Sequence, residues 1–253
     1  MAFVQVPRLK LGAATSVLCI VAVLGAPGSS FAAPNEAAGV VKATQELYGN
    51  IRTFSARITA VRSGKTPKGS FAETISEQTY YKAPNIFFQH VNISGSGLAA
   101  QVKQQLITVS NGSTILQYDA LHKVYVKSPA PKTASPIAIL QMKFNLATAH
   151  VLKSTSMFGR PCYEIQVEAQ LPAKFPPSVT KAQLAQIHEH AKVVLTIDKA
   201  NHKLLQLYSA AAGLRETIKG QVVNGSIPAS RFHFTPPAGS KEVHPQAPPT
   251  PGR

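Results

Sequence analysis

Residues 80–91, with the sequence YYKAPNIFFQHV, constrain the fold of this chain more than any other segment. Proline has no N–H for a β-ladder and favours an extended conformation in the residue before it. Pro84 therefore marks a break between two strands or a sharp bend in one. Four aromatic residues lie within nine positions around this break, in a chain that is only 7% aromatic. A sheet that gathers aromatic side chains beside a break builds either a tight core or an apolar cavity.

Alternation of apolar and polar residues predicts a mainly β chain of about ten to eleven antiparallel strands. Asn111-Gly112, between two extended runs, predicts a hairpin. A loop is predicted at residues 63–69 and a flexible break at 94–97. The predicted strands cover residues 54–60, 71–81, 86–93, 106–109, 114–118, 123–127, 163–167, 193–197, 204–208 and 215–223.

Three segments have helical periodicity. Residues 34–50 predict an N-terminal helix that begins near Asn35 and ends at Gly49. Residues 135–146 and 180–191 predict two further helices inserted between strands. No internal repeat and no second domain are indicated, so residues 33–243 are expected to form one domain.

The N-terminal segment indicates an exported protein. Residues 1–32 combine two basic residues, an uncharged apolar run and a small-x-small site, which predicts a signal peptide cleaved after about Ala32. Residues 244–253 predict a disordered proline-rich tail. After cleavage Cys162 is the only cysteine, so no internal disulfide can form and a monomer must rest on its own core.

The residues that enzymes and metal sites need are scarce. Asp119 and Asp198 are the only aspartates, and both lie in predicted turns. The motifs G-x-S-x-G and H-E-x-x-H and any cysteine cluster are missing from the sequence. The spaced pairs Glu73/Glu77 and Glu164/Glu168 are assigned to solvated strand faces. We expect no catalytic residue, no metal and no cofactor.

The net charge of +15 indicates which kinds of molecule the protein is expected to bind. For an exported protein, nucleic acid is not an expected partner. Anionic lipid headgroups or an acidic protein surface suit this charge better. A basic surface that serves only solubility fits equally well.

Four segments resemble motifs of the LolA family and occur in the same order as those motifs. The members of this family are periplasmic carriers that take lipoproteins to the outer membrane. The four segments are residues 53–56 (TFSA), 81–87 (YKAPNIF), 107–112 (ITVSNG) followed by Tyr118, and 231–239 (RFHFTPPAG), which resembles the family's closing strand. The resemblance spans about residues 38–243. It implies an unclosed antiparallel half-barrel whose helices form a lid over an acyl-chain cavity. It also implies lipoprotein acyl chains or lipid as ligand, an inner-membrane donor complex and an outer-membrane acceptor.

Strand alternation supplies the candidates for the cavity wall, although core and cavity wall look alike in sequence. The candidate wall residues are Phe54, Ile58, Tyr81, Phe87, Val91, Ile107 and Val109, and the candidate lid residues are Ala138, Leu140 and Leu184.

Ala83 stands where the family has an arginine that holds the lid to the sheet. Two functions therefore remain open at this point. One is a carrier of lipoprotein acyl chains or lipid. The other is an envelope-stress regulatory protein, or another exported lipid-sensing protein, with the same fold and no transport activity.

Overall fold

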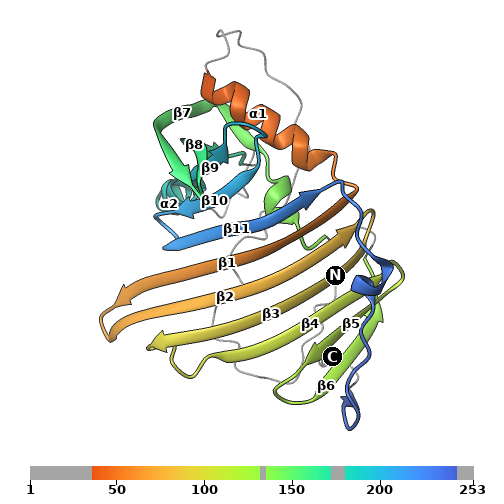
Figure 1. Ribbon diagram of the computed structural model, residues 1–253. Helices are drawn as coiled ribbons and strands as arrows, with labels where there is room; N and C mark the ends of the chain where they lie inside the picture. Colours follow the sequence, from red (N-terminus) through yellow and green to blue (C-terminus); the bar gives the residue numbers. More distant parts are fainter. Residues whose placement is uncertain (1–35, 132–134, 172–179, 244–253) are drawn as a thin grey trace, which may run out of the picture.

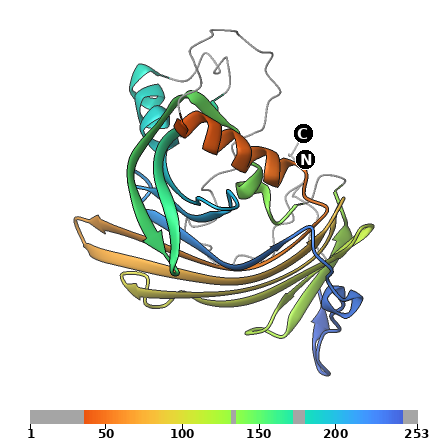
Figure 2. The same ribbon diagram turned by 45° about the horizontal axis from the view of Figure 1, so that its top comes forward.

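A single open sheet dominates the computed structural model, which describes residues 36–131, 135–171 and 180–243. Over these residues twelve strands follow the order β12-β6-β5-β4-β3-β2-β1-β11-β10-β9-β8-β7. Neighbours are antiparallel except β12, which runs parallel to β6. The end strands β7 and β12 do not pair with each other, so the curved sheet stays unclosed (Figures 1 and 2). The prediction of a mainly β half-barrel is confirmed, with more strands than expected.

The helices and strands have the following bounds. They are α1 Glu36–Gly49, β1 Thr53–Thr66, β2 Gly69–Lys82, β3 Ile86–Gly97, β4 Lys103–Asn111, β5 Thr114–Asp119, β6 Val124–Pro129, η1 Ala138–Gln141, β7 Phe144–Met157, β8 Arg160–Ala169, α2 Lys181–Ala191, β9 Lys192–Asp198, β10 Leu204–Ser209, β11 Leu214–Val223, η2 Ala229–Phe232 and β12 Lys241–Glu242. The predicted signal peptide at residues 1–32 and the predicted tail at 244–253 lie outside the described residues.

The central strands are longer than the sequence predicted. The loop predicted at residues 63–69 is only a turn at residues 67–68, because β1 continues to Thr66 and β2 begins at Gly69. Likewise, residues 94–97 form the end of β3. The glycines that suggested loops lie instead at close approaches: a Cβ on Gly64 would lie 2.7 Å from Cε1 of Phe71. Small residues here allow close packing within extended strands.

The predicted helix at residues 135–146 is wrong. Only the single 3₁₀ turn η1 forms there, and Phe144 already begins β7. β7 pairs with β8 through a register that shifts between Asn145 and His150 and again between Val151 and Lys153. These two irregularities break the period of two along β7, which hid the strand from the sequence pattern.

The segment that resembled the family's closing strand is not a strand. Residues 229–240 instead run across the sheet as the 3₁₀ turn η2 and a coil, because prolines 236 and 237 have no N–H for a ladder. The Phe234 ring lies 5.3 Å from the Tyr118 ring, and the guanidinium of Arg231 lies 5.3 Å from the Tyr80 ring. This segment therefore covers one face of β2–β5.

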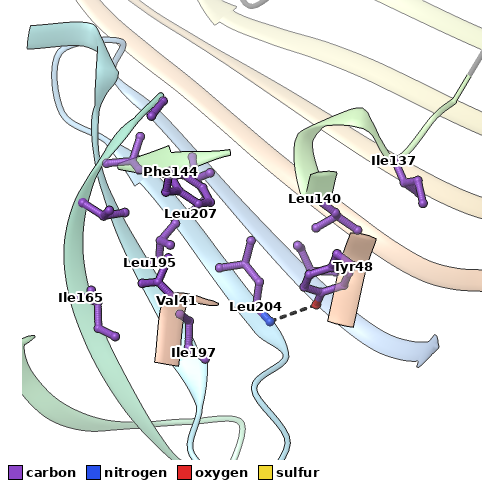
Figure 3. Close-up of a cluster of buried hydrophobic side chains, with 14 of the residues drawn as sticks. Val41, Tyr48, Ile137, Leu140, Phe144, Ile165, Leu195, Ile197, Leu204 and Leu207 are labelled. Carbon is purple, nitrogen blue, oxygen red and sulfur yellow. Dashed lines mark hydrogen bonds between the residues drawn. The ribbon is translucent and has the colours of Figure 1, made fainter. Parts of the chain in front are cut away.

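Helix α1 lies in the hollow of the opposite face (Figure 2). Its buried side turns toward the sheet, and the rings of Tyr48 and Phe54 meet edge to face at 6.5 Å. The Tyr48 hydroxyl donates to Oε1 of Gln221 at 2.6 Å and accepts from the Leu204 N–H at 3.0 Å (Figure 3). Within the described ranges, no helix has the length and apolarity needed to cross a bilayer. Through its contacts with the sheet, α1 fills and caps one end of the half-barrel.

Helix α2 begins and ends where the sequence predicted. The Thr180 side chain accepts from the Gln183 N–H, and the Gln183 side chain accepts from the Thr180 N–H, which completes a capping box. Only Ala191 of this helix is buried, and the helix lies against β8 and β9. α2 therefore depends on its cap and on few contacts with the sheet.

We predict that Tyr48→Phe lowers the free energy of unfolding by about 1–3 kcal/mol, since the buried Leu204 N–H loses its acceptor. Urea unfolding followed by circular dichroism measures the change. Tyr125→Phe, on the outer face of β6, is the matched control and should change stability by less than about 0.5 kcal/mol. Equal effects of the two substitutions would contradict the role assigned to the Tyr48 hydroxyl.

Candidate functional site: the concave face of the half-barrel

The face of the sheet that lies toward α1, called here the concave face, carries a row of aromatic side chains. Phe54 lies opposite Tyr81, and Tyr81 lies opposite Phe87, so the three share one face across β1, β2 and β3. All three are buried. The break at Pro84 separates β2 from β3, and the turn is fixed by the Tyr81 hydroxyl, which donates to the Pro84 carbonyl at 3.0 Å.

A second row lies four residues further along each strand, beyond Ala56. Ile58 lies opposite Glu77, Glu77 opposite Val91, and Val91 opposite Leu106. Ile58 is buried, whereas Val91 and Leu106 are half-buried. The structure thus brings five of the seven predicted wall residues to one face: Phe54, Ile58, Tyr81, Phe87 and Val91.

Ile107 and Val109 lie on the opposite face, called here the outer face. Val109 pairs with Phe88, and Ile107 pairs with His90 and Tyr118. The expectation that they share a face with Phe87 is wrong. In β4, Leu106 points to the concave face while Ile107 and Val109 point outward. Apolar residues therefore occur on both sides, and the register rather than the pattern fixes the orientation of the strand.

The hollow over the aromatic row is occupied by α1 and η1. Ile137 is fully buried and Leu140 is 4% exposed, and both belong to the main core cluster. Figure 3 shows Leu140 beside Tyr48. Of the predicted lid residues, Leu140 therefore lies over the concave face. Ala138 begins η1 and its side chain lies outside the described part of the structure.

Leu184, the third predicted lid residue, is not near η1. It is half-buried on α2, which lies against β8 and β9 and apart from η1 in both views (Figures 1 and 2). The two segments predicted as one lid therefore lie in different places, and only the segment around η1 covers the aromatic row.

Three surface hollows lie away from the predicted wall. One is at the β1–β2 tip around Phe71, a second beside Asn50 and Asn224, and a third under residues 234–240. None of these three is lined by the wall residues predicted from the sequence. In this structure, side chains of the protein itself fill the apolar end of the concave face.

Two carboxylates lie on the concave face among apolar side chains. Glu77 occupies the second row, and Glu216 lies opposite Ala60 and Leu207. Burial raises the pKa of Glu77, while hydrogen bonds from Thr79 and Gln89 oppose the rise. Burial, with a smaller contribution from the Glu77 charge, raises the pKa of Glu216 to about 7. Both groups are half-buried.

The assignment of Glu73 and Glu77 to a solvated face is therefore wrong. Both have the same parity in β2 as Ile75 and Tyr81, and this is the parity of the concave face. That shared parity was the available signal. Glu164, by contrast, alternates with buried neighbours on β8 and forms an ion pair with Lys153 at 3.4 Å.

The described residues contain no group of three or more histidine, cysteine, aspartate or glutamate side chains placed to hold a metal ion. Cys162 is buried, and burial raises the pKa of its thiol. A raised pKa lowers the thiolate fraction and with it the reactivity of a cysteine.

No protein-family model matches the sequence, and no curated protein is similar to it. Solved structures with a similar arrangement include LprF from Mycobacterium bovis, at 11% identity and a TM-score of 0.44, over 77% of this chain and 97% of that one. The lipoprotein LppX from Mycobacterium tuberculosis matches at 11% identity and a TM-score of 0.39, over 76% and 96%. A LolA superfamily protein from Nitrosomonas europaea matches at 10% identity and a TM-score of 0.26, over 78% and 97%.

At such low identities and TM-scores these similarities bear on neither ligand nor partner. The half-barrel itself follows from the chain's own strand order and register, with an N-terminal helix in its hollow.

Proposed function

We propose that the protein is an exported carrier that binds acyl chains, of a lipoprotein or a lipid, on the concave face of its half-barrel. The observation that supports this most is the grouping of Phe54, Tyr81, Phe87, Ile58 and Val91 on one face of a sheet that does not close. An apolar concave surface binds a hydrocarbon chain by removing it from water. No bond is made or broken in this function.

Binding at the aromatic row requires the η1 segment to leave. An acyl chain that buries about ten CH₂ groups gains about 8 kcal/mol, at about 0.8 kcal/mol per group. Returning Ile137 and Leu140 to water costs about 3–6 kcal/mol for the two side chains. The exchange is therefore favourable but close enough to balance that the ligand can be released again.

We further propose that the carrier takes up acyl chains at the inner membrane and releases them at the outer membrane. The signal-peptide pattern at residues 1–32 supports the periplasmic location that this requires. Ala83 packs at the edge of the core and donates its N–H to the Arg52 carbonyl at 2.7 Å. Its side chain offers η1 no positive charge, which supports the proposal that η1 is held weakly.

The direct test is to purify the mature chain from its native compartment and identify extracted lipids by mass spectrometry. We expect a bound lipid or lipoprotein, and release of a lipoprotein from inner-membrane vesicles when the purified chain is added. Bound lipid without any release would favour the lipid-sensing alternative. Absence of both lipid and acyl-probe binding would overturn the proposal.

We predict that Val91→Gln weakens binding of a fluorescent acyl probe at least fivefold, because it places a polar amide in the second row of the concave face. Ile107→Gln is the matched control, since Ile107 is also a half-buried β-branched residue but lies on the outer face. It should leave the affinity unchanged. Equal losses in the two variants would mean that binding does not use the concave face.

We predict that Leu140→Ala tightens probe binding by about tenfold or more. Truncating a buried leucine removes about 2–5 kcal/mol of packing, and about 1.4 kcal/mol corresponds to a tenfold change. Because that packing holds η1 in the hollow, its loss makes the hollow easier to open. Leu184→Ala, on α2, is the control and should not change the affinity measured by fluorescence titration.

A further inference from the structure

The two carboxylates of the concave face lie on either side of the same stretch of β1. Glu77 on β2 is opposite Ile58, and Glu216 on β11 is opposite Ala60. Apolar side chains surround both positions. These are Ile58, Ala60, Ile75, Val91, Leu207 and Ile218. The pair therefore stands where a hydrocarbon chain lying along the second row would cover it.

Neither carboxylate of this pair is neutralised by a cation. Thr79 donates its hydroxyl to Glu77, and Gln89 also bonds to Glu77. Among the described residues no ion pair reaches Glu77 or Glu216. The two charges repel each other, and burial raises the pKa of both groups.

The other charged groups on the concave face lie one row further toward the hairpin tips or across β4. Arg62 and Glu73 are opposite each other, and the Arg62 guanidinium lies 5.9 Å from the Phe71 ring. Asp119 is held by His122 at 2.7 Å. β10 presents the apolar Leu207 to Glu216.

Three cations on β1 and β11 point to the outer face. Arg57 bonds to Gln78, Lys219 lies over the Phe158 ring, and Arg215 lies over the Tyr208 ring. The buried part of α1 that faces the sheet carries no charged residue. The pair is therefore left without a compensating charge from the elements that surround it.

We propose that uptake of an acyl chain on the concave face is coupled to uptake of a proton by the Glu77–Glu216 pair. This inference rests on the proposed function. Covering the pair with hydrocarbon removes the remaining water from both carboxylates, which disfavours their charged forms. Burial already raises the pKa of Glu216 to about 7 before any ligand covers it, so part of the pair is charged at neutral pH. The ligand therefore binds best to the protonated pair. Mild acid should favour loading, and a higher pH should favour release.

The test uses the mature chain and an uncharged probe, pyrene-labelled diacylglycerol, titrated between pH 5.5 and 8.5 at constant ionic strength. We expect the dissociation constant to rise at least fivefold between pH 6 and pH 8, since one linked proton changes affinity by up to about tenfold per pH unit. Glu216→Gln should flatten this profile and Glu77→Gln should reduce it. Glu73→Gln, one row away from the pair, should keep the slope of the unchanged protein.

Calorimetry in two buffers of different ionisation enthalpy adds a direct count of protons. We expect a net uptake between zero and one proton per ligand at pH 7. Tight binding with no pH dependence and no proton uptake would overturn the inference while leaving the proposed function intact. If the affinity of Glu73→Gln were also independent of pH, the pH dependence could not be assigned to the Glu77–Glu216 pair.

A ligand-free measurement separates this inference from the proposed function. A carboxyl group whose pKa is raised on folding does not lower the free energy of unfolding at a pH below its unfolded pKa of 4.5. The loss of stability grows as the pH rises toward about 7 and is constant above that pH. Glu216→Gln should therefore raise the Tm by several degrees at pH 8 and leave it unchanged at pH 4.5. If the Tm difference is the same at both pH values, Glu216 is not desolvated and the inference fails, whether or not any lipid binds.

Discussion

The register between β1 and its two neighbours is the constraint on which the rest of the structure depends. β1 pairs with β2 along its whole length and with β11 on its other side. Because of this pairing, Phe54 and Ile58 face the hollow. Tyr81, Phe87 and Val91 lie opposite residues of the same face and therefore also point into the hollow. A slip by one residue would turn all of these side chains outward and bring polar ones such as Arg57 and Gln78 into the core. The uninterrupted pairing of β1 and β2 protects against that slip.

Much of this arrangement could be predicted from the sequence because the pattern and the physics agree. The strands β2 and β3 were predicted from their aromatic and β-branched residues, with the break at Pro84 between them, and Tyr81 and Phe87 do share the concave face. The bounds of α2 were equally clear. In each case a local preference and the tertiary structure favour the same outcome.

The errors have physical causes that a single sequence does not show. β4 has an apolar residue, Leu106, on one face and Ile107 and Val109 on the other, so only hydrogen bonding to β3 and β5 places Ile107 outside. β7 carries two register shifts, which destroyed its alternation. Residues 135–146 have helical periodicity, yet only a single turn forms there, with Leu140 packed in the core. Glu77 was misplaced for another reason, since a carboxylate suggests solvent even at a position whose parity points inward.

The position of β1 beside β11 also has a consequence for how the protein folds. The pair joins Phe54 to Val223, so the middle of the sheet is completed by residues far apart in the chain. The meander β1–β6 uses only local hairpins and can form as soon as its residues are available, whereas β1 keeps one bare edge until β11 has been made. Such non-local pairing is slow, and a bare apolar edge invites aggregation. The emerging chain therefore spends most of its synthesis with its most critical strand unprotected, and a chaperone that covers this edge should raise the yield of folded protein.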